Sequence, residues 1–338
     1  MFVFIVVRET FPVRKQYIIN KIILMGICSL PLLAGCQQNE TERELSATEM
    51  MSLRASVSNL SLSRTVTDAA DAATIFEAGD EIGFFMPEED APVKWTLTGD
   101  GWQSETPLVW EDKVNEFEFC AYYPYSEESA VRTAIPMPDL SAQTGEFSAL
   151  GEFDFLAARC TSGYKTNSGA VSFTGAYAFR HVYSLLSITV KKDRAEENVS
   201  ISKAVLKGSG LFSRTSYRFG ETSEADGIVA AADASPADEL SLAYDVPAEV
   251  ASETGYSLTL LCNPSVLEEN SEFSISYMRD GISYTATTDK LGKEFQAGTY
   301  NKYTLKLTKE GLVLIGQEIV GWNEEVIPDI AFEETPVE

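Results

Sequence analysis

The chain has very little histidine, the residue on which many enzymes and metal sites depend. Its 338 residues include a single histidine, His181. A metal site built on several histidines, or a catalytic triad built on another histidine, is therefore not available. Because His181 stands in an apolar strand pattern, we interpret it as a packed or hydrogen-bonded core residue.

Sequence motifs of the common catalytic and nucleotide-binding classes are missing as well. There is no Gly-x-Ser-x-Gly nucleophile elbow, no phosphate-binding loop and no dinucleotide fingerprint. Carboxylates are abundant, but nothing singles out a catalytic pair. We interpret the acidic runs at 88–90 and 324–325 as solvated loops, with calcium binding as the alternative. The sequence thus predicts no enzyme activity, no catalytic residues, no metal and no cofactor.

Basic residues are outnumbered two to one. There are 26 Lys and Arg against 51 Asp and Glu, and the formal net charge is −25. A surface that acidic repels nucleic acid phosphates and anionic membranes. We therefore exclude nucleic acid as a partner and interpret the charge as a solubility feature.

Long hydrophobic runs are also absent, and the one notable run is near the N-terminus. Lys21 precedes an apolar stretch of 12 residues, 22–33, which is shorter than the roughly 20 residues of a membrane-spanning helix but fits the core of a signal peptide. Leu33-Ala34-Gly35-Cys36 then forms a bacterial lipobox. We expect 1–35 to be a lipoprotein signal peptide, Cys36 to carry the lipid, and 36–44 to be a polar tether. The mature protein would be a surface-exposed lipoprotein of the outer membrane, with several acyl chains giving stable anchoring.

Cysteine is sparse and lacks metal-binding or redox spacing. Cys28 would leave with the signal peptide, which leaves Cys120, Cys160 and Cys262 far apart in the mature chain and without a Cys-x-x-Cys pair. We interpret these three as buried free thiols; one disulfide with one free thiol is the alternative. The four tryptophans stand in strand patterns, so we interpret them as core residues, the alternative being a platform for a sugar.

What the sequence does have is strand periodicity. Near the C-terminus Tyr303, Leu305 and Leu307 alternate with polar residues, 309–311 forms a turn, and a second strand follows over 312–322. Residues 273–286 predict a hairpin about Asp280-Gly281, in which Tyr277 faces Tyr284 and Ile275 faces Ala286. The stretch around 182–190 is apolar on both faces, as in a central strand.

Strands recur every 10 to 15 residues or so, and no long helical period is present. The fold class predicted is therefore all-β, with two tandem antiparallel β-sandwich domains. We place the boundary in the charged stretch 191–198, which gives an N-terminal domain at 45–191 and a C-terminal domain with a tail at 192–338.

The order of several short motifs resembles one known family. These are FEAGDEIGFF (76–85), PLVW (107–110), FEFCAYYPY (117–125), Gln143, DFLAA (154–158), FRHVYSLLSITV (179–190) and AGTYNKYTLKLTKEGLVLIGQEIVGW (297–322). With the lipobox upstream, the chain resembles the fimbrillin (Mfa-like) lipoproteins of Gram-negative anaerobes. The resemblance implies two transthyretin-like β-sandwich domains and assembly into type V pili, with other pilus subunits as partners, adhesion to a host or bacterial surface, and a place in the fimbrium.

The resemblance also implies how stalk subunits assemble. A trypsin-like protease cuts after a basic residue near the N-terminus, the first strand leaves, and a C-terminal segment of a neighbouring subunit fills the groove, which is β-strand addition. Carried over to this chain, Arg64 or Arg54 is the candidate cleavage site, Arg64 being preferred. Ile327, Ile330 and Phe332 are the candidate donor-strand residues.

The tail departs from a plain donor strand, because Pro328 and Pro336 cannot donate ladder hydrogen bonds. A stalk role and a tip, anchor or accessory role therefore both stay open. The alternative function is a surface lipoprotein that binds glycans and does not polymerise.

Overall fold

The structure is a computed structural model, and it describes residues 50–58, 75–127, 130–231, 238–266 and 271–322. Within these ranges the chain is built almost wholly of β-strands, joined by turns and four short 3₁₀ helices. The prediction of an all-β protein is confirmed. None of the helices in the described ranges has the length and hydropathy needed to cross a lipid bilayer.

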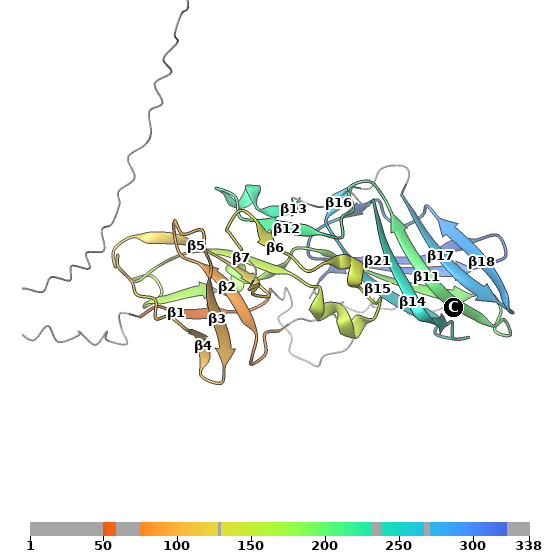
Figure 1. Cartoon of the computed structure of the whole chain (residues 1–338), viewed down its shortest axis with the longest axis horizontal. Helices are drawn as coiled ribbons and strands as arrows, with labels where there is room; N and C mark the ends of the chain where they lie inside the picture. Colours follow the sequence, from red (N-terminus) through yellow and green to blue (C-terminus); the bar gives the residue numbers. More distant parts are fainter. Residues whose placement is uncertain (1–49, 59–74, 128–129, 232–237, 267–270, 323–338) are drawn as a thin grey trace, which may run out of the picture. The chain divides into compact units, whose positions relative to one another are not determined.

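The N-terminal strands form a six-stranded sheet of order β4-β3-β2-β5-β7-β9, and a two-stranded sheet of β1 and β8 packs with it (Figure 1). Between them lies an aromatic-rich core cluster that contains Phe84, Trp110, Phe119, Phe173 and Phe179. The strands of these two sheets are β1 (Ser52–Ala55), β2 (Glu81–Phe85), β3 (Val93–Thr98), β4 (Gly101–Ser104), β5 (Glu116–Tyr123), β7 (Leu156–Gly163), β8 (Ala170–Phe173) and β9 (Arg180–His181).

The C-terminal strands form two four-stranded sheets, of order β15-β10-β20-β21 and β14-β11-β17-β18, that share a second and larger core cluster. In Figure 1 the labelled strands β11, β14, β17 and β18 run side by side. The strands are β10 (Ser184–Lys192), β11 (Val199–Lys207), β14 (Glu239–Glu249), β15 (Tyr256–Cys262), β17 (Glu272–Arg279), β18 (Ile282–Thr288), β20 (Thr299–Leu307) and β21 (Leu312–Gly321).

Smaller elements connect the two groups of strands. A three-stranded sheet of order β13-β12-β6 pairs Ile135 and Pro136, from the N-terminal half of the chain, with Tyr217 and Ser216. The remaining elements are β6 (Ile135–Pro136), β12 (Thr215–Arg218), β13 (Gly227–Ala230), β16 (Ser265–Val266), β19 (Glu294–Phe295), and the 3₁₀ helices η1 (Leu140–Ala142), η2 (Phe147–Glu152), η3 (Gly175–Tyr177) and η4 (Ser223–Ala225).

The local strand predictions agree with the observed register. In the β17–β18 hairpin Tyr277 pairs with Tyr284 and Ile275 with Ala286. The two turn residues, Asp280 and Gly281, have φ of 49° and 84°, as a two-residue turn of the kind that matches strand twist requires. The predicted C-terminal pair is also present as β20 and β21, with Gly311 at φ 140° in the turn between them.

The central-strand prediction for 182–190 holds for β10, which pairs with β15 on one side and β20 on the other. That pairing groups residues 184–191 with the C-terminal strands, so the expected boundary between 191 and 192 falls inside β10. The charged residues that suggested a linker form the short connection from β10 to β11. We therefore propose a boundary drawn before β10. Most ladders are antiparallel, as expected, but β10–β20 and β1–β8 are parallel.

Gly83 of β2 is required by the close approach of an aromatic ring. A Cβ added at Gly83 would lie 2.1 Å from Cε1 of Tyr122. Tyr122 has no exposed surface and stacks on Phe155 at an interplanar angle of 11°, so the ring cannot swing aside without disturbing the larger core cluster.

We expect Gly83→Ala to destabilise the protein by about 1–3 kcal/mol, because overpacking a filled core forces strained side chains or backbone shifts. Gly151→Ala is the matched control, since nothing lies within 4 Å of its added Cβ. Urea unfolding followed by tryptophan fluorescence measures both. Equal stability of the two variants would contradict this packing argument.

Candidate functional site

The candidate site is the place where the first strand, β1, sits on the N-terminal sandwich. β1 pairs in parallel with β8, with Leu53 opposite Val171 and Ala55 opposite Phe173. Further backbone hydrogen bonds continue on both sides of the strand: Met51 N–H donates to Leu108 O at 2.7 Å and Ser58 N–H donates to Phe179 O at 2.7 Å. Residues 51–58 are thus held as one extended segment, longer than β1 itself.

Two side chains fix this segment to the core. Leu53 and Val57 are buried in the aromatic-rich cluster, whereas Arg54 between them is exposed. Burying an aliphatic side chain of this size contributes about 1.5–3 kcal/mol. Val57 also forms a parallel bridge with Phe179, whose ring packs edge-on against Phe173.

β8, the strand that pairs with β1, is itself held in place by a tryptophan side chain. Trp110 is buried, and its indole Nε1–H donates to Gly169 O at 2.9 Å, just before β8 begins. Gly169 O also accepts from Ser52 N–H at 3.1 Å. The start of β8 therefore serves as a shared anchor for the first strand and for the core.

β1 has β8 as its only strand partner among the described elements. A parallel two-stranded ribbon has little stability of its own, so it depends on the packing of its side chains. Removal of β1 would expose the edge of β8 and the surfaces of Val171, Phe173 and Phe179 that Leu53 and Val57 cover. The arrangement can act as a seat for an extended, partly apolar segment.

Of the candidate lipidation, cleavage and donor-strand residues, only Arg54 lies in the described ranges. It is exposed in β1, opposite Ser172. Cys36, Arg64, Ile327, Ile330 and Phe332 lie outside the described residues, and their roles stay predictions.

The tryptophans and the acidic run at 88–90 were the candidates for a sugar platform and for calcium binding. Trp95, Trp110 and Trp322 are buried, and Trp102 is half-buried against Phe76, with 5.2 Å between ring centroids. The core interpretation of the tryptophans is thereby confirmed. The acidic run at 88–90 is exposed. Across the described residues no group of three His, Cys, Asp or Glu side chains could hold a metal ion.

His181 is a core residue, as predicted. Its imidazole is buried, its Nδ1 lies 2.8 Å from Oδ2 of Asp154, and its ring stacks on Trp322 with centroids 3.7 Å apart and planes 4° apart. Trp322 in turn donates its backbone N–H to Gly298 O at 2.6 Å. This stack fixes the end of β21 beside β9.

The three described cysteines are buried free thiols, which agrees with the preferred prediction. Burial raises the pKa of the Cys120 thiol to about 12, against an opposing effect of Arg159 and Arg132, and burial also raises the pKa of Cys160 to about 12. Since the thiolate is the reactive form, both thiols are inert at neutral pH.

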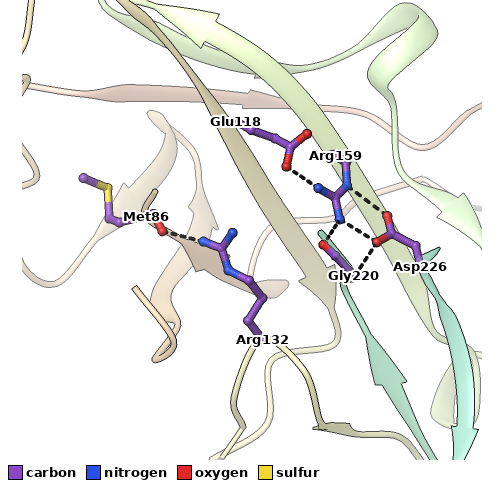
Figure 2. Close-up of polar contacts among 6 residues, drawn as sticks. All are labelled: Met86, Glu118, Arg132, Arg159, Gly220 and Asp226. Atoms are coloured by element: carbon purple, nitrogen blue, oxygen red, sulfur yellow. Dashed lines mark hydrogen bonds and ion pairs between the residues drawn. The ribbon is translucent and has the colours of Figure 1, made fainter. Parts of the chain in front are cut away.

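Sequence reasoning missed a partly buried ion cluster on the other face of β7, in which the Arg159 and Asp226 side chains are 11% and 13% exposed and Glu118 is 44% exposed. Arg159 lies between Glu118 of β5 and Asp226 before β13, and Figure 2 shows its guanidinium bonded to both carboxylates and to Gly220 O. Nη2 donates to Asp226 Oδ1 at 2.5 Å and Nε donates to Oδ2 at 2.9 Å. The Arg159 guanidinium also lies over the ring of Phe219, with 5.7 Å to its centroid.

This cluster ties the turn between β12 and β13 to the six-stranded sheet. Asp226 also accepts from Gly220 N–H at 2.8 Å, which closes the turn on itself. A second arginine contact is also drawn in Figure 2: the Arg132 guanidinium donates a hydrogen bond to Met86 O at 2.6 Å. No sequence pattern indicates that Arg159 and Asp226, which are 67 residues apart, form an ion pair. Strand alternation predicts only that Arg159 and Cys160 face opposite sides of β7.

We expect Arg159→Met to destabilise the protein by about 1–3 kcal/mol, because it leaves the largely shielded Asp226 carboxylate without its cation. Adding Asp226→Asn should recover part of that loss, since no unpaired charge then remains. Thermal unfolding of the single and double variants gives the coupling. A loss under about 1 kcal/mol for Arg159→Met would show that the cluster is solvated like a surface pair.

Comparison with known proteins gives a consistent picture. The family model described as Fimbrillin-like matches residues 63–322, which is most of the chain. The chain belongs to the fimbrillin-like family. The resemblance inferred from the sequence motifs is thereby confirmed, and the fimbrial and adhesion proteins that the chain resembles are not enzymes.

One curated relative and two solved structures illustrate the similarity. A provisionally assigned fimbrium tip subunit of Bacteroides ovatus, Fim1C, is 28% identical over 136 residues, which cover 38% of this chain and 25% of the relative. The chain thus matches about a quarter of the length of that relative. Crystal structures of provisionally assigned cell adhesion proteins from Bacteroides uniformis and Bacteroides ovatus are 18% and 17% identical, with TM-scores of 0.52 and 0.53. Each match covers 81% of this chain and 98% of the other, and this level of likeness shows a shared fold.

Proposed function

We propose that this fimbrillin-like protein is a pilus subunit or pilus-associated protein of the cell surface that contributes to adhesion and assembles by strand exchange. The single observation that carries the proposal is the seat of β1. The first strand has one strand partner, β8, among the described elements, and it places two buried side chains, Leu53 and Val57, in the core. An equivalent strand from another chain would take its place by re-forming this ladder and refilling two buried positions.

The physical logic is that an exposed strand edge is a template for another extended chain. Main-chain hydrogen bonds to β8 would be re-formed by any incoming strand, and apolar side chains at alternate positions would refill the sites of Leu53 and Val57. A contact of this head-to-tail kind does not close on itself, so it generates a filament. The candidate donor residues are Ile327, Ile330 and Phe332, although Pro328 and Pro336 leave tip and anchor roles open beside a stalk role.

Between the two candidate cleavage positions, the geometry supports Arg64. Arg54 lies inside β1, so a cut there would leave residues 55–58, with buried Val57, attached to the body. A cut after Arg64 would separate the whole segment that occupies the seat. The glycan-binding alternative has less support, because the tryptophans that would form its platform are packed in or against the core.

The test of cleavage uses an arginine-specific, trypsin-like protease on the purified chain. We expect a cut after Arg64, followed by ladders of oligomers on unheated denaturing gels. Arg64→Ala should abolish both, while Arg54→Ala, the matched control in the exposed position of β1, should leave both intact. Ladders that form equally in the Arg64→Ala variant would remove cleavage at this residue from the proposal.

The proposed export route is tested separately at Cys36. We propose that Cys36 carries the lipid that holds the protein at the outer membrane, where several acyl chains are needed for stable attachment. Cys36→Ala should move the protein from the membrane fraction to the soluble fraction, and Cys28→Ala, in the segment removed with the signal, should not. If the Cys36→Ala protein stays with the membrane and metabolic labelling with a fatty acid is unchanged, the lipid is not on this residue.

A further inference from the structure

A groove of about 1040 Å³ lies beside β7, and Ser58, the last described residue of the segment that contains β1, also lines it. Its walls include Arg159, Cys160 and Thr161 of β7 on one side and Tyr217, Phe219 and Ile228 on the other. Tyr177 and Arg180 lie along it as well, and Trp322 lines it too. Its size suits an extended stretch of polypeptide rather than a single small molecule.

One wall of this groove is a strand edge with an incomplete ladder. β7 pairs with β5 along all of its residues, from Leu156 opposite Tyr123 to Gly163 opposite Glu116. On its other side, the described strands supply only β9, which pairs with Leu156 and Ala157. Beyond β9, residues 158–161 of β7 line the groove and have no strand partner on that side among the described strands. An edge of this kind accepts a further strand.

The chain itself delivers a segment to this edge. Trp322 lines the groove and is fixed there by its stack on His181 of β9 and by its hydrogen bond to Gly298 O. The sequence continues for 16 residues beyond it, which in extended form reach about 50 Å at roughly 3.3 Å per residue. The part of β7 that lines the groove beyond β9, residues 158–161, is about 13 Å long by the same measure.

The pattern of the tail fits a single added strand. Val326, Ile330 and Phe332 fall at alternate positions and share one face of an extended chain. Pro328 and Pro336 are eight residues apart, so both would turn their missing N–H to the same side. If that side faces solvent, the tail can still form its backbone hydrogen bonds to β7. The prolines then prevent a further strand from pairing with the outer edge of the tail.

We propose that, before assembly, residues 326–332 of the tail dock in cis along the open edge of β7, within the groove lined by Arg159, Tyr217 and Trp322. This inference rests on the proposed function for its biological meaning, because the same tail carries the candidate donor residues. Tethering at Trp322 gives the tail an effective concentration on the order of millimolar at its own groove, which free neighbours do not reach. Cis docking thus protects an edge that would otherwise pair at random and withholds the donor from other subunits.

The test is amide hydrogen exchange by mass spectrometry on the purified, uncleaved chain, without protease, over a hundredfold range of concentration. Amides of residues 158–161 should be protected equally at all concentrations. Deleting residues 323–338 should make them exchange at least tenfold faster, and a synthetic 323–338 peptide added to the truncated chain should restore protection. The edge strand β18, Ile282–Thr288, is the internal control and should not change.

A substitution pair serves if the truncated chain folds poorly. Ile330→Asp with Phe332→Asp should expose residues 158–161 in the full-length chain, while Thr335→Asp should not. Exchange that is the same with and without the tail overturns the proposal. Protection that falls on dilution also overturns it, because docking would then be between molecules. If the protease-induced oligomer ladders do not form, the proposed function fails but the docking of the tail does not, since the exchange experiment involves no cleavage.

Discussion

Backbone hydrogen bonding at strand edges is the constraint on which this structure depends. An all-β chain must pair, cover or exchange every edge, because an unpaired row of N–H and C=O groups is a site for uncontrolled association. Here the C-terminal sheets place β10 and β20 in central positions, each with two partners. The N-terminal sandwich instead closes one sheet with β1, which has a single partner, and leaves β7 beside a groove.

The division between a fixed and an exchangeable part follows from how side chains are packed. Arg159 links the six-stranded sheet to the turn between β12 and β13 through charge-assisted bonds to Glu118 and Asp226. By contrast, β1 is held by two aliphatic side chains and a short ladder, which an incoming strand of similar pattern would be able to replace. The proposed strand exchange requires a body that stays folded when β1 leaves, and interactions of the first kind contribute to that stability.

The sequence could predict elements whose determinants are local. The β17–β18 hairpin was predicted to the residue because Asp280-Gly281 sets the register and alternation sets the face. His181 and the tryptophans were assigned to the core from their strand patterns. The parallel pairing of β1 with β8 and of β10 with β20 joins segments more than 100 residues apart, and no local signal encodes such a partner. The charged stretch in which the sequence analysis placed the domain boundary connects β10 with β11 in the structure.

The candidate site shows the same limit at the level of function. Alternation in the first strand region could suggest a strand near a basic residue, but it could not show that Leu53 and Val57 enter an aromatic core or that Arg54 between them faces solvent. Those facts bear on the proposed cleavage, because a cut releases the first strand only where it frees every residue of the segment. A cut inside β1 would leave Val57 attached to the body, whereas a cut beyond residue 58 would not. The placement of β1 thus gives a physical reason for the preference for Arg64 that the sequence pattern alone did not supply.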